Sequence, residues 1–255
     1  MAAGADAHRL VQAGVAVVGF NAAGRGSHRP WDPRSTGTPD FNGPRDQDDL
    51  AAITRYISAK RWVDSASLGF ATVSYGLVAA AGCLSRHRDL GVGYLIDEEG
   101  PSDRFDAMLR AWTLATVEAP DWPQRAATLF GVTTEDDAFW IPREPKRTLG
   151  RYRGAYLRLQ AEFDHVQPPR SAAERPLFHH PPRWWQNKHA IALINAAVAG
   201  GVPWTRINLP AQGNPPNTAW SMDSPPRWLD GTMSAQPQAW VDAVLELIRT
   251  EAPLP

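Results

Sequence analysis

Short apolar runs and helix-like segments alternate along this chain of 255 residues. The apolar runs predict buried strands at residues 15–22, 65–73, 90–97, 155–164 and 203–210. Apolar positions that recur with a helical period predict helices at residues 5–14, 47–62, 75–87, 183–201 and 237–252. Strands and helices that alternate in this order indicate an α/β fold, with a parallel sheet flanked by helices.

Segment 98–154 breaks the regular order. It is acidic and contains Trp residues, and we interpret it as a lid-like excursion over the cleft. A hydrophobic content of 43% is enough to fill one core in a chain of this length. We therefore expect residues 1–255 to form a single domain.

Composition and charge restrict the partners. Lys and Arg total 26 against 27 Asp and Glu, without a basic block, which argues against nucleic acid and against an anionic membrane. No apolar run approaches the roughly 20 residues of a membrane span, and no secretory signal is visible. Cys83 is the single cysteine, so the chain suits a reducing compartment and we expect it to be cytoplasmic. A small uncharged molecule is the partner that fits best.

The stretch "TVSYG", residues 72–76, places Ser74 between a predicted strand and an Ala-rich helix. A sharp strand-to-helix turn exposes a serine hydroxyl at the C-terminal edge of a parallel sheet, where open α/β folds bind ligands. The N–H of the next residue, Tyr75, would face an oxyanion at the helix N-terminus. Ser-x-Gly alone is also compatible with a plain helix N-cap.

With these segments together, the chain resembles the α/β-hydrolases of the dienelactone hydrolase and prolyl oligopeptidase-like group. "LVQAGVAVVGFNAAGRGS" is similar to the helix, strand and Gly-rich turn before the nucleophile strand, and "DQDDLAAITRYISAKRWVDSASLGFATVSYG" matches the following helix and nucleophile turn. "YLRLQAEFDHVQPP" looks like the strand and loop that deliver the acid. The resemblance implies that Ser74 is the nucleophile, Asp164 the triad acid and Tyr75 N–H an oxyanion donor.

The chain departs from the family pattern at the triad histidine. The family has it in the loop after the last strand, where this chain has Asn214, and an amide cannot act as a general base. The remaining candidates for the base are His165, beside the predicted acid, and His189, near the start of the following helix. His179 and His180 lie in a Pro-rich loop, where solvated roles are expected.

A second departure concerns the N-terminal part of the family fold. Few residues precede the predicted strand at 15–22, so we expect the chain to lack the family's earlier strands; in the family, a loop after one of them supplies the other oxyanion N–H. An open sheet edge would result, and a partner subunit in a homo-oligomer could cover it.

Asp97, Glu98 and Glu99 follow the strand beside the nucleophile strand. Asp97 or Glu98 could replace Asp164 as the triad acid, and the three carboxylates could contribute to a divalent cation site. Their spacing matches no metal motif, and ion pairs with Arg104 and Arg158 are the favoured use, so we expect no metal and no cofactor.

Three functions fit these residues. We expect a serine hydrolase that cleaves an ester or related acyl bond of a small molecule through an acyl-enzyme. The alternative is a catalytically silent relative that binds a small ligand in the cleft. In the third function, acid/base or metal chemistry is provided by Asp97, Glu98 and Asp164, and the serine has only a supporting role.

Overall fold

The computed structural model describes residues 3–25, 35–104, 122–163, 182–233 and 236–249. Four parallel strands form the main sheet in the order β1-β2-β3-β5, and two more strands form a small parallel sheet, β4-β6. The strands are β1 (Gly69–Val73), β2 (Tyr94–Glu98), β3 (Ala155–Leu159), β4 (Ala161–Phe163), β5 (Trp204–Ile207) and β6 (Leu229–Thr232). The predicted α/β class with a parallel sheet is confirmed.

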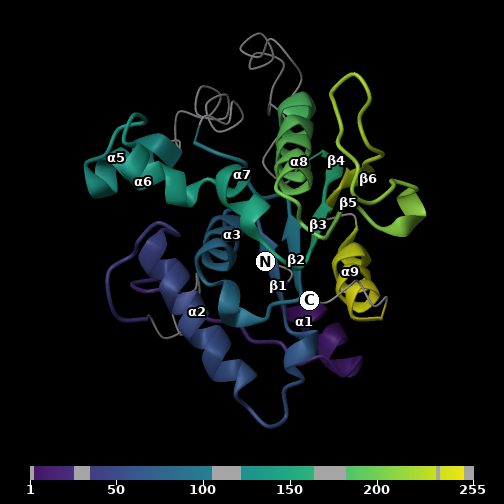
Figure 1. Cartoon of the computed structure of the whole chain (residues 1–255), viewed down its shortest axis with the longest axis horizontal. Helices are drawn as coiled ribbons and strands as arrows, with labels where there is room; N and C mark the ends of the chain where they lie inside the picture. The colour runs from purple at the N-terminus through teal and green to yellow at the C-terminus, as the bar shows by residue number, and fades with distance from the viewer. Residues whose placement is uncertain (1–2, 26–34, 105–121, 164–181, 234–235, 250–255) are drawn as a thin grey trace.

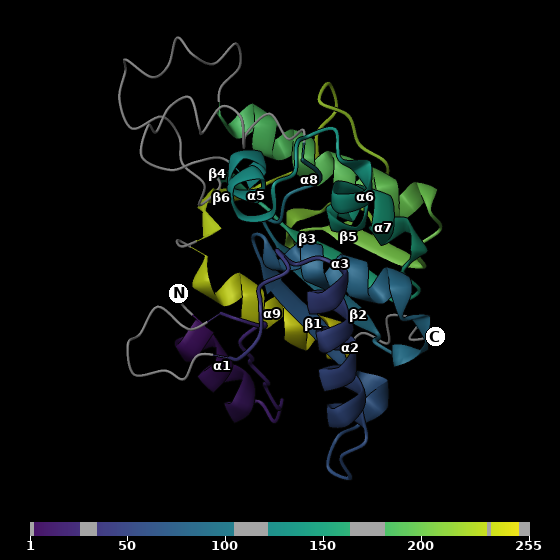
Figure 2. The same cartoon turned by 90° about the vertical axis from the view of Figure 1, so that its left-hand side faces the viewer.

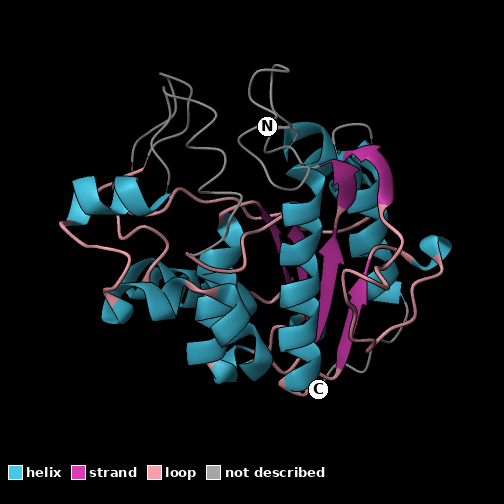
Figure 3. Cartoon of the chain, turned by 90° about the horizontal axis from the view of Figure 1, so that it is seen from above, coloured by secondary structure: helices cyan, strands magenta, loops and turns pink. Residues whose placement is uncertain are grey.

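Helices surround the main sheet (Figures 1 and 3). The longer ones are α1 (Ala3–Gln12), α2 (Pro44–Ser58), α3 (Gly76–Arg86), α5 (Trp122–Phe130), α8 (Pro182–Ala199) and α9 (Pro237–Arg249). Two single-turn helices are α6 (Asp137–Trp140) and α7 (Pro145–Thr148). The 3₁₀ helices are η1 (Ser65–Ser67), η2 (Arg88–Leu90), η3 (Ile141–Arg143), η4 (Leu149–Arg151) and η6 (Pro210–Gln212). No helix in the described ranges is long and apolar enough to cross a bilayer.

Two apolar cores lie on opposite faces of the sheet because successive side chains of a strand point to opposite sides. Leu95 and Tyr156 join a core that includes α3, η4 and α8. Ile96 and Leu157 join a second core with α9 and Leu10 of α1. α1 and α9 pack together on this second face, as Figure 2 shows. The molecule therefore has three layers, with the sheet in the middle.

The single cysteine belongs to the first core. Cys83 is buried on α3, and burial raises the pKa of its thiol to about 12. Cys83 thus packs as a small apolar residue on the buried face of α3.

The predicted strand at residues 15–22 is wrong. This segment belongs to neither sheet, and Val17, Val18 and Phe20 are 41%, 49% and 46% exposed. A strand needs a neighbour for its backbone N–H and C=O groups, and the described part of the chain provides none. β1 is consequently an edge strand of the main sheet, and Val73 near the end of β1 is 52% exposed.

The predicted strand at residues 155–164 is divided in two. Gln160 interrupts it, because its backbone N–H donates to Asn208 Oδ1 (2.8 Å) instead of continuing the ladder with β5. The chain then changes to the small sheet, where β4 pairs with β6. β6 and the helices α5 to α7 have no counterpart in the sequence prediction.

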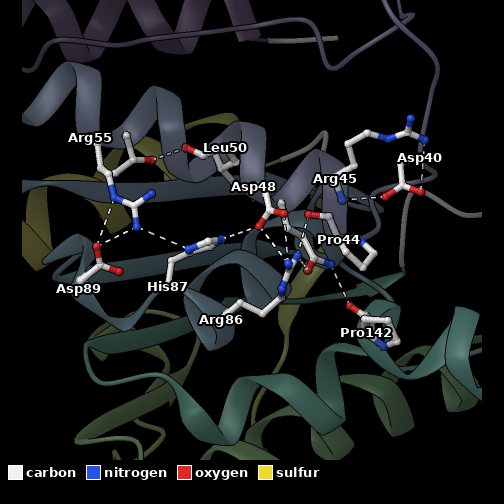
Figure 4. Close-up of polar contacts among 12 residues, drawn as sticks. Asp40, Pro44, Arg45, Asp48, Leu50, Arg55, Arg86, His87, Asp89 and Pro142 are labelled. Carbon is white, nitrogen blue, oxygen red and sulfur yellow. Dashed lines mark hydrogen bonds and ion pairs between the residues drawn. The ribbon is translucent and has the colours of Figure 1, made fainter.

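α2 lies along α3 and is connected to the C-terminal end of α3 by polar contacts. Asp48 accepts a hydrogen bond from Arg86 and contacts His87 Nε2 at 2.7 Å, while Arg55 pairs with Asp89 (Figure 4). Arg86 also donates to the Pro44 carbonyl (2.6 Å). These contacts hold the start of α2 close to α3, whose other end adjoins Ser74.

Candidate active site

Ser74 is located where β1 turns into α3, and its backbone is left-handed, with φ of +53°. Its N–H donates to the carbonyl of Glu98 (2.7 Å), and its own carbonyl accepts from Leu77 N (3.2 Å). A non-glycine residue in this region of backbone space is strained and is over-represented at functional sites. Ser74 therefore has the backbone geometry of a nucleophile at a strand-to-helix turn.

Tyr75 follows in a right-handed conformation directly before α3. Its carbonyl accepts a short hydrogen bond from Asn42 Nδ2 (2.6 Å), and its ring lies 5.2 Å from the Phe41 ring. Burial raises the pKa of the Tyr75 phenol, so the side chain stays neutral. Contacts from outside the turn thus hold the residue that carries the predicted oxyanion N–H.

An aromatic cluster adjoins this turn. It contains Phe41 and Trp140, which are buried, and the partly buried Tyr75, Phe130 and Phe139. Ring centroids lie 5.0 to 6.4 Å apart, and the Arg143 guanidinium stacks 3.8 Å from the Phe139 centroid. The rings of α5 and α6 therefore form an apolar wall beside the residue after Ser74.

His189 contacts a different serine. Ser102 N–H donates to His189 Nδ1 (3.3 Å), and the Ser102 hydroxyl lies 3.1 Å from the same atom. A nitrogen that accepts from a backbone N–H carries no proton, so neutral His189 is protonated on Nε2. Burial lowers the pKa of His189 to about 3, against a smaller opposing effect of Asp103. At neutral pH this imidazole is a weak base, and its Nδ1 is already engaged.

Comparisons with known proteins give structural matches only. Models of known protein families do not match the chain, and neither do characterised protein sequences. Dipeptidyl peptidase 4 of Porphyromonas gingivalis matches 80% of the chain with a TM-score of 0.51 and 14% identity. The chain has the α/β-hydrolase fold.

Two further matches to this fold have TM-scores below 0.5. Puromycin hydrolase matches 80% of the chain at 20% identity (TM-score 0.48). The acylaminoacyl peptidase of Pyrococcus horikoshii matches 84% at 12% identity (TM-score 0.49). The chain spans only 24% of the puromycin hydrolase, 22% of the dipeptidyl peptidase and 30% of the acylaminoacyl peptidase.

Asn214, where the sequence resemblance leads us to expect the triad histidine, has a structural role. Its Nδ2 donates to the carbonyls of Ile207 (3.0 Å) and Arg227 (2.8 Å), and its Oδ1 accepts from Arg227 N (2.8 Å). The side chain is buried, with 2% exposed. It closes the loop between β5 and β6 and offers no group that could accept a proton from a serine.

Asp97, the alternative acid, lies near the C-terminal end of β2, an inner strand of the main sheet. It accepts hydrogen bonds from Arg158 Nη1 (2.6 Å), Tyr156 OH (2.8 Å) and Gly100 N (2.9 Å), and it is fully buried. The predicted ion pair with Arg158 is confirmed, whereas Arg104 pairs with Glu144 and Asp137 instead. These three donors engage the Asp97 carboxylate, and in the described part of the chain none of its hydrogen-bond partners is a histidine.

Glu98 contributes through its backbone. The Glu98 carbonyl holds the N–H of Ser74, and Glu99 adopts a left-handed backbone with φ of +52°. Within the described ranges no group of three or more His, Cys, Asp or Glu side chains converges on one point as metal ligands would.

Asp164, His165, His179 and His180 lie outside the described residues, so the predicted acid, the candidate base His165 and the two histidines of the Pro-rich loop are not placed. Among described residues the Ser74 hydroxyl has no hydrogen-bond partner.

The sequence analysis did not single out Phe41 and Asn42, two consecutive residues whose backbones are left-handed. The signal was "FNGPRD", because Asn-Gly favours positive φ and Pro favours the first turn of a helix.

Proposed function

We propose that the protein is a serine hydrolase that cleaves an ester or a related acyl bond of a small molecule, with Ser74 as the nucleophile. The observation that carries this proposal is the left-handed backbone of Ser74 between β1 and α3 in an α/β-hydrolase fold. This geometry supports a hydroxyl presented at the C-terminal edge of the sheet, beside the N-terminus of α3.

In this mechanism the Ser74 hydroxyl attacks the acyl carbon and loses its proton to a histidine. The oxygen of the tetrahedral intermediate accepts a hydrogen bond from Tyr75 N–H. The same histidine then protonates the leaving group, and an acyl-enzyme forms. Water attacks the acyl carbon while the histidine takes a proton from it. The bond between the acyl carbon and Ser74 Oγ then breaks, and the histidine returns the proton to Ser74 Oγ as the acid is released.

Of the two candidate bases we favour His165, by elimination of His189. The depressed pKa of His189 and its contact with Ser102 argue against His189 as the base. His165→Gln should therefore abolish most of the activity, and His189→Gln should reduce it far less. The pH profile of kcat/KM tests this choice, because loss of the working base removes the acidic limb of the profile.

The aromatic cluster beside Tyr75 supports an apolar or aromatic group on the substrate. Phe130 and Phe139 are partly exposed, and neither carries a hydrogen-bonding side chain. A small apolar acyl ester therefore suits the site better than a charged one.

Intact-mass analysis after incubation with a fluorophosphonate tests the function. We expect one adduct on the wild-type protein, no adduct on Ser74→Ala and an adduct on the control Ser58→Ala, whose serine terminates α2. Absence of an adduct from folded wild-type protein would rule out an activated Ser74.

That negative result would favour the second candidate, a silent relative that binds a ligand in the same cleft. The observation in its favour is that the side chain of Asn214, where the resemblance leads us to expect the triad histidine, is fully engaged in hydrogen bonds. Thermal stabilisation by a small apolar ester, without hydrolysis of the ester, would then support it.

A further inference from the structure

Phe41 and Asn42 are two consecutive non-glycine residues with left-handed backbones, at φ of +55° and +58°. Asparagine tolerates this region, but a bulky residue such as phenylalanine is a real outlier there. Both residues are buried, with 5% of each exposed. Such strain persists only where surrounding contacts impose it, and it is a reason to look for a functional constraint.

Buried groups hold the Asn42 backbone from both sides. Asn42 N–H donates to Asp46 Oδ2 (2.8 Å), and the Asn42 carbonyl accepts from Gln47 Nε2 (3.0 Å). Asp46 and Gln47 are on the first turn of α2, with 3% and 0% exposed. Gln47 Nε2 also donates to the carbonyl of Pro142 (2.8 Å). Asn42 is therefore rigidly attached to the start of α2.

From this fixed position, Phe41 and Asn42 contact Tyr75 in three ways. Asn42 Nδ2 donates to the Tyr75 carbonyl (2.6 Å), the Phe41 ring packs on the Tyr75 ring, and the Tyr75 hydroxyl lies 3.5 Å from the Phe41 carbonyl. The Tyr75 ring and carbonyl are thus both held from outside α3, although the carbonyl also accepts from Val78 N of α3 (3.2 Å). The peptide between Ser74 and Tyr75 is fixed in turn by the hydrogen bond from Leu77 N to the Ser74 carbonyl.

We propose that Asn42 is a positioning residue for the nucleophile turn: its side-chain amide holds Tyr75 so that Tyr75 N–H points at the oxyanion. This inference rests on the proposed function of Ser74. An oxyanion donor is effective only if it is preorganised toward the oxyanion, and a misplacement of about 1 Å can lower the rate on the order of 10²-fold. Loss of the Asn42 amide should therefore slow the chemical step and leave substrate binding unchanged.

The test compares Asn42→Gly and Asn42→Asp with the wild-type protein. Glycine keeps the left-handed backbone and removes the amide, whereas aspartate keeps the size and removes the donor. We expect both variants to show a rate constant for fluorophosphonate labelling of Ser74 that is about 10- to 100-fold lower. For an ester such as p-nitrophenyl acetate, kcat should fall by a similar factor at unchanged KM.

Asn217→Gly is the matched control. Asn217 is also an asparagine with a left-handed backbone (φ +52°), and its Oδ1 accepts from Thr205 N (2.7 Å). Thr205 lies near the beginning of β5, and Ser74 follows the end of the parallel strand β1, so Asn217 is at the opposite edge of the sheet. This variant should label at the wild-type rate.

The end-point of labelling separates positioning from a merely structural role. A structural role would lower the labelled fraction and leave the rate constant of the folded fraction unchanged, and this result would overturn the proposal. If Asn42→Gly does not fold, Asn42→Asp alone decides in the same way. A wild-type protein that is never labelled would overturn the function of Ser74 together with the role of Asn42. A labelled wild type with equally reactive Asn42 variants would overturn the role of Asn42 alone.

Discussion

At the scale of single residues, Ser74 has a backbone conformation that glycine adopts more easily than serine. A residue with a Cβ atom at φ near +53° is strained by about 1–2 kcal/mol, because the Cβ approaches the backbone. Selection for stability alone would favour glycine at this position. The serine is therefore better explained by its hydroxyl than by its fit to the turn.

Ser74→Gly should consequently be more stable than Ser74→Ala by about 1 kcal/mol, since only alanine retains the strain. For a domain of this size the melting temperature should differ by about 2–4 °C. The matched pair is Ser58→Gly and Ser58→Ala, at the end of α2. Here the alanine variant should be the more stable of the two, because glycine is unfavourable in a helix. Equal melting temperatures for the two Ser74 variants would show that a Cβ atom at position 74 causes no backbone strain.

At the scale of elements, α2 and α3 pack closely where Gly82 of α3 faces Gln47 of α2. A Cβ added at Gly82 would overlap the side-chain amide of Gln47, which is fixed by hydrogen bonds to Asn42 and Pro142. The amide could move only by giving up these bonds, and it is fully buried. The glycine therefore permits the close approach of the two helices.

Gly82→Ala should destabilise the protein by about 1–3 kcal/mol, the cost of unsatisfied buried polar groups, although alanine normally stabilises a helix. Gly76→Ala on the same helix is the control, because a Cβ there would have ordinary contacts, the nearest being Thr72 Cβ at 3.6 Å. Urea titrations measure the free energy of unfolding of both variants. If this overlap is the cause, Gly82→Ala should lower the free energy of unfolding by less in a Gln47→Ala background than in the wild type. An equal loss in both backgrounds would refute the overlap as the cause.

At the scale of the whole molecule, apolar periodicity predicted the elements that pack on the sheet, because burial of one face determines them. β1, α3, β2, α8, β5 and α9 were found in this way. Residues 15–22 have the composition of a buried strand, but pairing depends on a neighbour that local sequence does not reveal. The strand-to-helix turn at Ser74 was predictable from the local sequence. The Asn42 contact was not, because 33 positions separate it from Tyr75 and only the fold brings them together.

The buried ion pair of Asp97 and Arg158 joins β2 and β3, the two inner strands of the main sheet. The two side chains are 0% and 1% exposed, and Arg158 also donates to the Gly100 carbonyl (2.8 Å) and to Gln160 Oε1 (2.6 Å). Removal of one partner leaves an uncompensated charge in the core, which costs about 3–5 kcal/mol. The stability of the whole sheet should therefore depend on the pair.

Asp97→Asn and Arg158→Met should each lower the free energy of unfolding by this amount in urea titrations. The double variant should lose clearly less than the sum, because it buries no unpaired charge. Asp89→Asn, which removes the exposed pair with Arg55, should shift the urea midpoint little, since solvent screens both groups. Additive losses in the double variant would mean that hydrogen bonds to the individual side chains, and not the charge pairing, hold β2 against β3.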